Sequence, residues 1–128
     1  PLDTLLAESD VVSLHCPITQ ETKHLISHKE LQLMKPSCIL INTARGALIN
    51  EDALRMALVD GEISGAAIDV LSTEPPANGN ILLDDLIPNL IITPHVAWVA
   101  RESRQRLLDQ VAGNVEAFLR DEARNLVC

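Results

Sequence analysis

Three residues that could carry out acid–base chemistry on an anionic substrate each stand shortly after a strand-sized apolar run. They are Arg45, Glu74 and His95. A guanidinium binds a carboxylate through two parallel hydrogen bonds, and a carboxylate beside an imidazole favours the charged form of the ring. A Glu74–His95 pair could therefore keep a proton donor available near neutral pH. Any one of these residues alone is more often a solvated turn residue, but the three together predict a reaction site.

Four apolar runs predict the strands that would position these side chains. The runs cover residues 11–14, 38–41, 66–70 and 90–93, and each is strand-sized and nearly continuous. Such runs are typical of parallel strands in a sheet covered on both faces, which suits a chain with only 2% aromatic residues. Ligands bind beyond the carboxyl ends of parallel strands, so the residues after each run should lie along one edge of the sheet.

Helix signals alternate with these runs. Ser27 begins a capping box for a helix over 28–35. Asn50 can cap a second helix, which Gly61 should end. Residues 72–80 contain two prolines and an Asn-Gly pair, and they predict a loop. The alternation of strands and helices predicts an α/β fold with a parallel sheet and flanking helices.

The longest helical pattern covers residues 101–120 and carries one apolar stripe, which needs a partner surface. Residues 2–6 indicate a short helix that leads into the first strand. Trp98 stands just before the long helix. It could either close a substrate site or pack under that helix, and the sequence leaves both open.

Composition excludes several classes of function. The 128 residues carry 10 Lys+Arg against 18 Asp+Glu, a net charge of -8, so we expect no nucleic-acid surface. No apolar run approaches the roughly 20 residues of a membrane helix. The three cysteines form no CxxC pair, which favours a reducing, cytoplasmic setting. Nothing in the sequence arranges a base and an orienting partner beside Cys16, so we expect it to pack rather than to act as a nucleophile. His24 and His28 stand four residues apart, but no further ligand completes a set, so we expect no metal site.

Four motifs stand in order along the chain: SDVVSLHCP at 9–17, NTARG at 42–46, AIDV at 67–70 followed by EPP at 74–76, and TPH at 93–95. They resemble the successive motifs of the D-isomer-specific 2-hydroxyacid dehydrogenases. The match extends over essentially all 128 residues, and the tail is most similar to the branch of bacterial glycerate dehydrogenases and hydroxypyruvate reductases.

The resemblance implies a role for each site residue. His95 would be the general acid and base, Glu74 its orienting partner, and Arg45 the group that binds the carboxylate and keto oxygen of the substrate. Asp69 would bind the nicotinamide carboxamide of the cofactor, although a buried acid satisfied by loop amides is an alternative. The other cofactor-lining positions, which Arg45 and His95 also border, would be His15, Cys16, Pro17, Thr43 and Ala44.

The same resemblance implies an oxidoreductase that transfers a hydride between NAD or NADP and a small 2-keto or 2-hydroxy acid, such as hydroxypyruvate and D-glycerate. We also expect a cytoplasmic homodimer, from the cysteine pattern and from the apolar surface that the chain should expose. Glu74 favours a proton-transferring dehydrogenase, because the similar formate dehydrogenases carry Gln at that position.

The sequence has no GxGxxG loop of the kind that holds a pyrophosphate at a helix N-terminus. Residues 1–100 therefore resemble the C-terminal half of a doubly wound, Rossmann-type dinucleotide-binding domain. Residues 101–128 resemble a terminal helix that packs toward a substrate domain outside this chain. We expect such a fragment to be inactive alone and to expose apolar surface and an unpaired strand edge.

Two other functions stay open. The first is an NADH-sensing module like the corepressors that resemble this family, with little or no turnover. The second is a fragment with no role beyond folding.

Overall fold

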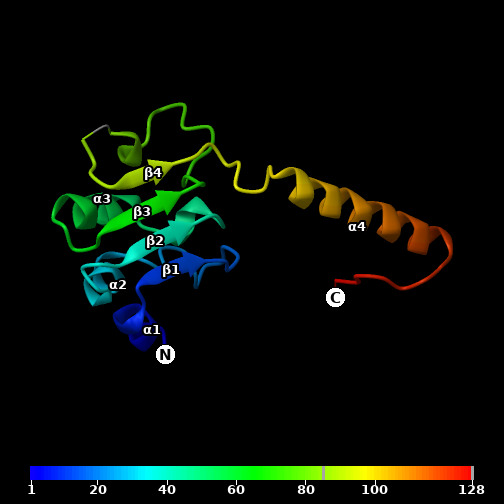
Figure 1. The fold of residues 1–128 in the computed structure, drawn as a ribbon, viewed down its shortest axis with the longest axis horizontal. Coiled ribbons are helices and arrows are strands. Elements are labelled where there is room, and N and C mark those ends of the chain that lie inside the picture. Colours follow the sequence, from blue (N-terminus) through cyan, green and yellow to red (C-terminus); the bar gives the residue numbers. More distant parts are fainter. Residues whose placement is uncertain (85, 128) are drawn as a thin grey trace. The chain divides into compact units, whose positions relative to one another are not determined.

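A four-stranded parallel sheet forms the framework of the protein in the computed structural model, which describes residues 1–84 and 86–127. The strands lie in the order β1-β2-β3-β4 (Figure 1). All four predicted strands are confirmed, with ends within two residues of those expected. Their bounds are β1 (Val11–Leu14), β2 (Ile39–Asn42), β3 (Gly65–Ile68) and β4 (Leu90–Ile92).

Helices flank the sheet between the strands, as predicted. The first two are α1 (Leu2–Glu8) and α2 (His28–Leu33). The Ser27 N–H donates to Glu30 Oε2 at 3.1 Å, which confirms the capping box. Helix α2 ends two residues before the predicted boundary, because the backbone turns extended at Met34.

Helix α3 (Glu51–Val59) follows β2 and the short 3₁₀ helix η1 (Gly46–Leu48). Asn50 Oδ1 accepts from the Ala53 N–H at 3.0 Å, so the predicted cap is confirmed. The chain leaves α3 through Gly61, whose positive φ of 72° suits a residue without a Cβ. A loop and a second 3₁₀ helix, η2 (Ile81–Leu83), then lead to β4.

The helices cover one face of the sheet, not both. Helix α2 contacts both α1 and α3, and η2 contacts α3 (Figure 1). Their buried side chains form one aliphatic cluster with those on the covered face of the sheet. The cluster includes Leu6, Leu31, Leu54 and Leu82 from the helices and Val12, Leu14, Leu40, Ala66 and Ile68 from the strands.

The other face of the sheet stays open, which differs from the doubly covered sheet that the apolar runs predict. In register, Val11 lies beside Ile39, and Ala67 lies beside Ile91. Val11, Ile39 and Ile91 are 53%, 42% and 65% exposed. Within the unit Pro1–His95, helices therefore cover only one face of the sheet, although its strands are apolar on both.

Contacts divide the chain into two compact units, Pro1–His95 and Val96–Cys128. The second contains α4 (Arg101–Leu119), and its following tail binds back onto this helix. Arg124 donates to Gln110 Oε1 at 3.1 Å, and Asn125 donates to Asn114 Oδ1 at 3.0 Å. The predicted apolar stripe is exposed at Leu107, Leu108, Val111, Val115, Phe118 and Leu119. Cys128 lies outside the described residues.

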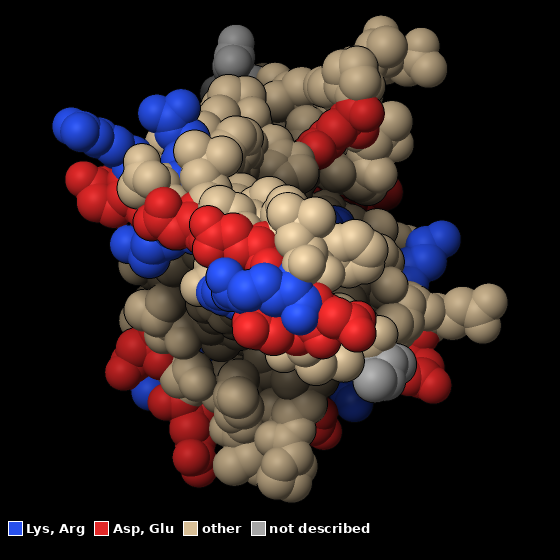
Figure 2. All heavy atoms as spheres, turned by 90° about the vertical axis from the view of Figure 1, so that its right-hand side faces the viewer, with Lys and Arg blue, Asp and Glu red and all other residues tan. Residues whose placement is uncertain are grey.

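Two general expectations about the surface can be compared with the structure. Within residues 1–84 and 86–127, no helix is both long enough and apolar enough to cross a membrane. On the face drawn in Figure 2, acidic and basic side chains are interspersed, and no continuous basic stripe crosses that face.

Candidate active site

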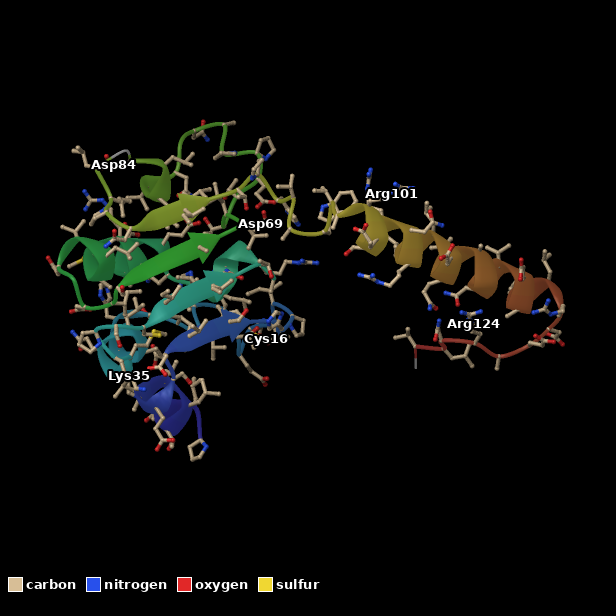
Figure 3. All side chains as sticks on the ribbon, in the orientation of Figure 1. Cys16, Lys35, Asp69, Asp84, Arg101 and Arg124 are labelled. Carbon is tan, nitrogen blue, oxygen red and sulfur yellow. The ribbon has the colours of Figure 1, made fainter. Side chains whose placement is uncertain are left out.

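The predicted site residues follow the carboxyl ends of the four parallel strands. Figure 3 places Cys16 and Asp69 beside the arrowheads of the strands, whereas Lys35 and Asp84 lie at the opposite edge of the sheet. Because the strands are all parallel, the loops after β1, β2, β3 and β4 leave the same edge. The sheet thus gathers segments that are far apart in sequence.

Glu74 and His95 are in direct contact. Glu74 Oε2 lies 2.6 Å from His95 Nδ1, and the other carboxylate oxygen, Oε1, accepts from the Leu71 N–H at 2.7 Å. The backbone of His95 is fixed as well, since its N–H donates to the Asp69 carbonyl at 2.9 Å. The imidazole and its acidic partner are therefore both anchored to the end of β3.

The electrostatics of this pair favour an ionised carboxylate. The hydrogen bond with His95 holds the pKa of Glu74 below its ordinary value of 4.5, and the Leu71 N–H lowers the pKa further. Partial burial of the carboxylate raises its pKa, but the hydrogen bonds lower the pKa by more. Glu74 is thus negatively charged at neutral pH, with its carboxylate in contact with the His95 ring.

Asp69 is a buried acid at the end of β3, with 4% exposure. The Thr93 hydroxyl donates a short hydrogen bond to Asp69 Oδ1. Burial of a carboxylate is costly without such donors. The arrangement fits either a ligand-binding acid or one that is satisfied by its own loops.

Arg45 lies in the loop after β2, and its position depends on Asn42. Asn42 is fully buried; its Nδ2 donates to the Arg45 carbonyl at 2.9 Å, and its Oδ1 accepts from the Ala44 N–H at 3.0 Å. The exposed guanidinium of Arg45 donates to the Ala44 carbonyl at 2.6 Å. The sequence patterns did not identify Asn42 as a residue that positions Arg45. An amide side chain at the end of a buried strand could have indicated this role, because a buried amide needs hydrogen-bond partners.

Two hollows contain most of the predicted site residues. One, of about 530 Å³, is lined by Glu74 and His95 together with Leu71, Pro75, Pro76, Leu83, Ile92, Thr93 and Pro94. The other, of about 480 Å³, is lined by His15, Cys16, Pro17, Ile18, Ala44 and Arg45. The structure therefore pairs Glu74 with His95 and groups Arg45 with most of the predicted cofactor residues. Thr43 is exposed and lines neither hollow.

A close backbone contact joins the Arg45 loop to the Glu74 loop. A Cβ added to Gly46 would lie 2.0 Å from the Leu71 carbonyl carbon and 2.4 Å from Ser72 N. Only glycine permits this approach. The positions of the two loops are consequently linked.

Trp98 lies in the second unit and is 55% exposed. Both predicted roles for it therefore stay predictions. Cys16 and Cys38 are free thiols, and burial raises the pKa of the Cys38 thiol. Among the described residues, no group of three or more His, Cys, Asp or Glu side chains could hold a metal ion.

Comparison with known proteins matches residues 1–97 to the model of the D-isomer specific 2-hydroxyacid dehydrogenase, NAD binding domain. The chain is 54% identical to the glycerate dehydrogenase of Methylorubrum extorquens over 98% of its own length and 40% of that protein. It is 44% identical to the hydroxypyruvate reductase of Blautia hydrogenotrophica, over 98% of the chain and 38% of that protein.

Solved structures agree with these sequence matches. The NAD-complexed D-isomer specific 2-hydroxyacid dehydrogenase of Lactobacillus delbrueckii ssp. bulgaricus superposes with a TM-score of 0.82 at 36% identity, over 96% of this chain and 40% of that one. The chain thus spans about 40% of the length of these relatives. With the order of its four motifs, its parallel sheet and the family match over residues 1–97, the chain belongs to the D-isomer specific 2-hydroxyacid dehydrogenase family.

Proposed function

We propose that this chain supplies the proton-transfer pair of an NAD(P)-dependent D-2-hydroxyacid dehydrogenase. The observation that carries the proposal is the 2.6 Å contact between Glu74 Oε2 and His95 Nδ1 at the carboxyl edge of the sheet. The substrate class is a small 2-keto or 2-hydroxy acid. The relatives named glycerate dehydrogenase and hydroxypyruvate reductase favour the pair hydroxypyruvate and D-glycerate.

The residues present fit one end of a nicotinamide dinucleotide. Asp69 is a carboxylate with 4% exposure at the end of β3, where it can accept hydrogen bonds from an amide group. Beside the same edge, the hollow lined by His15, Cys16, Pro17, Ile18, Ala44 and Arg45 has the concave, partly apolar lining of a ligand site. These residues would hold the cofactor, which supplies or accepts the hydride when bound.

His95 performs the proton transfer in this proposal. Because Nδ1 contacts Glu74, we assign the proton exchange to the other ring nitrogen, Nε2. The ionised Glu74 orients the ring through its contact with Nδ1. In reduction, the imidazolium gives its proton to the developing alkoxide of the substrate, and in oxidation the neutral ring removes that proton.

Arg45 binds the substrate carboxylate and keto oxygen. A guanidinium offers two parallel donors to a carboxylate. Arg45 is exposed and its Nη1 binds a neighbouring carbonyl at 2.6 Å, so the side chain exchanges this contact for the substrate. Orientation of the acid group fixes which face of the keto carbon is presented for reaction.

The test replaces His95 by alanine in the full-length protein and follows NADH consumption with hydroxypyruvate. We expect turnover to fall by about 10²–10⁴-fold, the usual contribution of an acid–base group. The matched control is His28→Ala, which removes an exposed histidine at the start of α2. Unchanged turnover in the His95 variant would contradict the proposal. If the unaltered protein binds NADH without consuming it in the presence of 2-keto acids, the NADH-sensing alternative is supported.

We further propose that residues 101–128 pack toward a substrate domain and that the protein is a cytoplasmic homodimer. The exposed apolar stripe of α4 supports the first part. The free thiols of Cys16 and Cys38 suit a reducing compartment. The open face of the sheet offers an apolar surface for association.

A further inference from the structure

Glu51 binds the loop that carries Glu74. Glu51 is the first residue of α3, and its carboxylate accepts three hydrogen bonds from that loop. Oε1 accepts from the Ser72 N–H at 2.8 Å, and Oε2 accepts from the Ser72 hydroxyl at 2.6 Å and from Asn80 Nδ2 at 2.9 Å. A single carboxylate thus holds both ends of residues 72–80.

Two consecutive backbone amides bind two different carboxylates at the start of this loop. The Leu71 N–H donates to Glu74 Oε1 at 2.7 Å, and the next amide, that of Ser72, donates to Glu51. The peptide that Glu51 fixes is therefore adjacent to the one that holds Glu74. Any shift of Ser72 would displace the Leu71 amide and, with it, the carboxylate that contacts His95.

Asn80, at the C-terminal end of the loop, is also held by two hydrogen bonds. Asn80 Oδ1 accepts from the Leu82 N–H at 2.9 Å, which directs the Asn80 amide nitrogen toward Glu51. Between these ends, residues 73–79 are exposed apart from the half-buried Pro76. Packing against the core contributes little to the position of this segment, so the polar contacts at its ends must define that position.

The side chain of Glu51 is not required to cap its own helix. The cap hydrogen bond of α3 comes from Asn50, which accepts from the Ala53 N–H. A negative charge in the first turn is favourable in its own right, but Asp52 supplies one in the same turn and is exposed. The three contacts of Glu51 thus serve the loop rather than the start of the helix.

We propose that Glu51 is a positioning residue for the Glu74–His95 pair, acting through Ser72 and Asn80. This inference rests on the function proposed above. It assigns Glu51 no contact with substrate or cofactor. Its effect on the reaction passes through the placement of Glu74.

The test is a double-mutant cycle in the full-length protein with the variants Glu51→Gln, Glu74→Gln and both together. Gln at 51 has one acceptor oxygen in place of two, so its NH₂ faces either the Ser72 N–H or Asn80 Nδ2, and the loop loses part of its anchor in both orientations. We expect kcat to fall by about 10-fold in Glu51→Gln, because small misplacements of a catalytic group cost up to about 10²-fold. The KM for hydroxypyruvate should change by less than about twofold, since Glu51→Gln replaces no residue proposed to contact the substrate.

In the Glu74→Gln background, the Glu51 substitution should cause no further loss. Residues that act through one another are non-additive, whereas independent ones multiply. Equal losses in both backgrounds would overturn the inference. Asp52→Asn is the matched control, because it removes an exposed carboxylate from the same helical turn and should leave kcat unchanged.

The two proposals fail in different ways. If Glu74→Gln itself leaves turnover unchanged, the proposed function is wrong. If Glu74→Gln is impaired and Glu51→Gln is fully active, only the role of Glu51 is wrong. Should Glu51→Gln not fold, Ser72→Ala removes one of the three donors to Glu51. It should lower kcat by about 2- to 5-fold, less than Glu51→Gln, because the other two contacts remain. Full activity in Ser72→Ala would then overturn the inference.

Discussion

At the scale of single residues, the site depends on polar side chains that hold other polar side chains. Glu74 contacts His95, Asn42 binds the backbone on either side of the Ala44–Arg45 peptide, and the buried Asp69 accepts from Thr93. Asn42 and Asp69 are buried, so their contacts satisfy groups whose desolvation would otherwise be costly. The geometry of the site is thus specified by hydrogen bonds more than by the aliphatic core.

The lowered pKa of Glu74 gives a pH-dependent contribution to stability. The pKa of Glu74 is lower in the folded state than its ordinary value of 4.5, so the ionised carboxylate stabilises the fold fully when the pH is above 4.5. That contribution is lost as the pH falls through the lower folded-state pKa. We therefore expect Glu74→Gln to lower the Tm at neutral pH and the difference from the unaltered protein to shrink below pH 4.5.

Thermal unfolding of both proteins across this pH range measures the difference. Glu21→Gln, at an exposed position, is the control and should leave the Tm unchanged at each pH. A Tm difference between Glu74→Gln and the unaltered protein that does not depend on pH would contradict the assignment of the effect to ionised Glu74.

At the scale of elements, the two loops after β2 and β3 behave as one structure. Gly46 begins η1 and lies against the backbone of Leu71 and Ser72. Glu51, five residues further along the chain, binds the same segment at Ser72. The connection between β2 and α3 therefore supports the loop that carries Glu74.

Substitution of Gly46 by alanine should separate these loops. The added Cβ would lie 2.0 Å from the Leu71 carbonyl carbon, so the backbone must move. We expect a loss of about 1–3 kcal/mol in the free energy of unfolding, as for other overpacked sites. We also expect turnover to fall, because the displaced loop carries Glu74. Chemical unfolding and NADH consumption measure the two effects.

Gly61→Ala is the matched control for this substitution. Its φ of 72° disfavours a side chain, but a Cβ there would meet nothing within 4 Å. It should cost about 1–2 kcal/mol of stability from backbone strain alone and leave turnover unchanged. Equal losses of turnover in the two variants would mean that general destabilisation, rather than loop separation, explains the Gly46 result.

At the scale of the whole chain, the described residues leave two apolar surfaces exposed. One is the open face of the sheet, where Ile91 is 65% exposed, and the other is the stripe on α4, where Phe118 is 82% exposed. The edge strands β1 and β4 each pair on one side only within the described part of the chain. Such surfaces promote association.

We expect the 128-residue chain, produced by itself, to associate in solution. Light scattering during size-exclusion chromatography should give a mass above the 14.0 kDa of one chain. Ile91→Lys places a charge on the open face and should reduce that mass. The control Met56→Lys adds the same charge at a half-exposed position on α3 and should not. A well-behaved monomer with a sharp unfolding transition would contradict this expectation.

The sequence by itself determined the elements and the chemical types of the site residues. Apolar runs predicted all four strands, and the capping signals at Ser27 and Asn50 predicted the starts of α2 and α3. These features are local, because a periodic pattern or a cap depends on residues within a few positions of one another. The positions of Arg45, Glu74 and His95 after the apolar runs made them candidates, and the family resemblance added their roles, which await the experiments above.

The sequence put forward the Glu74–His95 pair as a hypothesis, but only the tertiary structure decided which of these residues meet. The contact of Glu74 with His95 spans 21 positions in the sequence, and so does that of Glu51 with Ser72. Likewise, the close approach of Gly46 to Leu71 and the cover of a single sheet face depend on where the helices and loops pack. Such pairings follow from the paths of separate segments in space, and no local pattern of residue types records those paths.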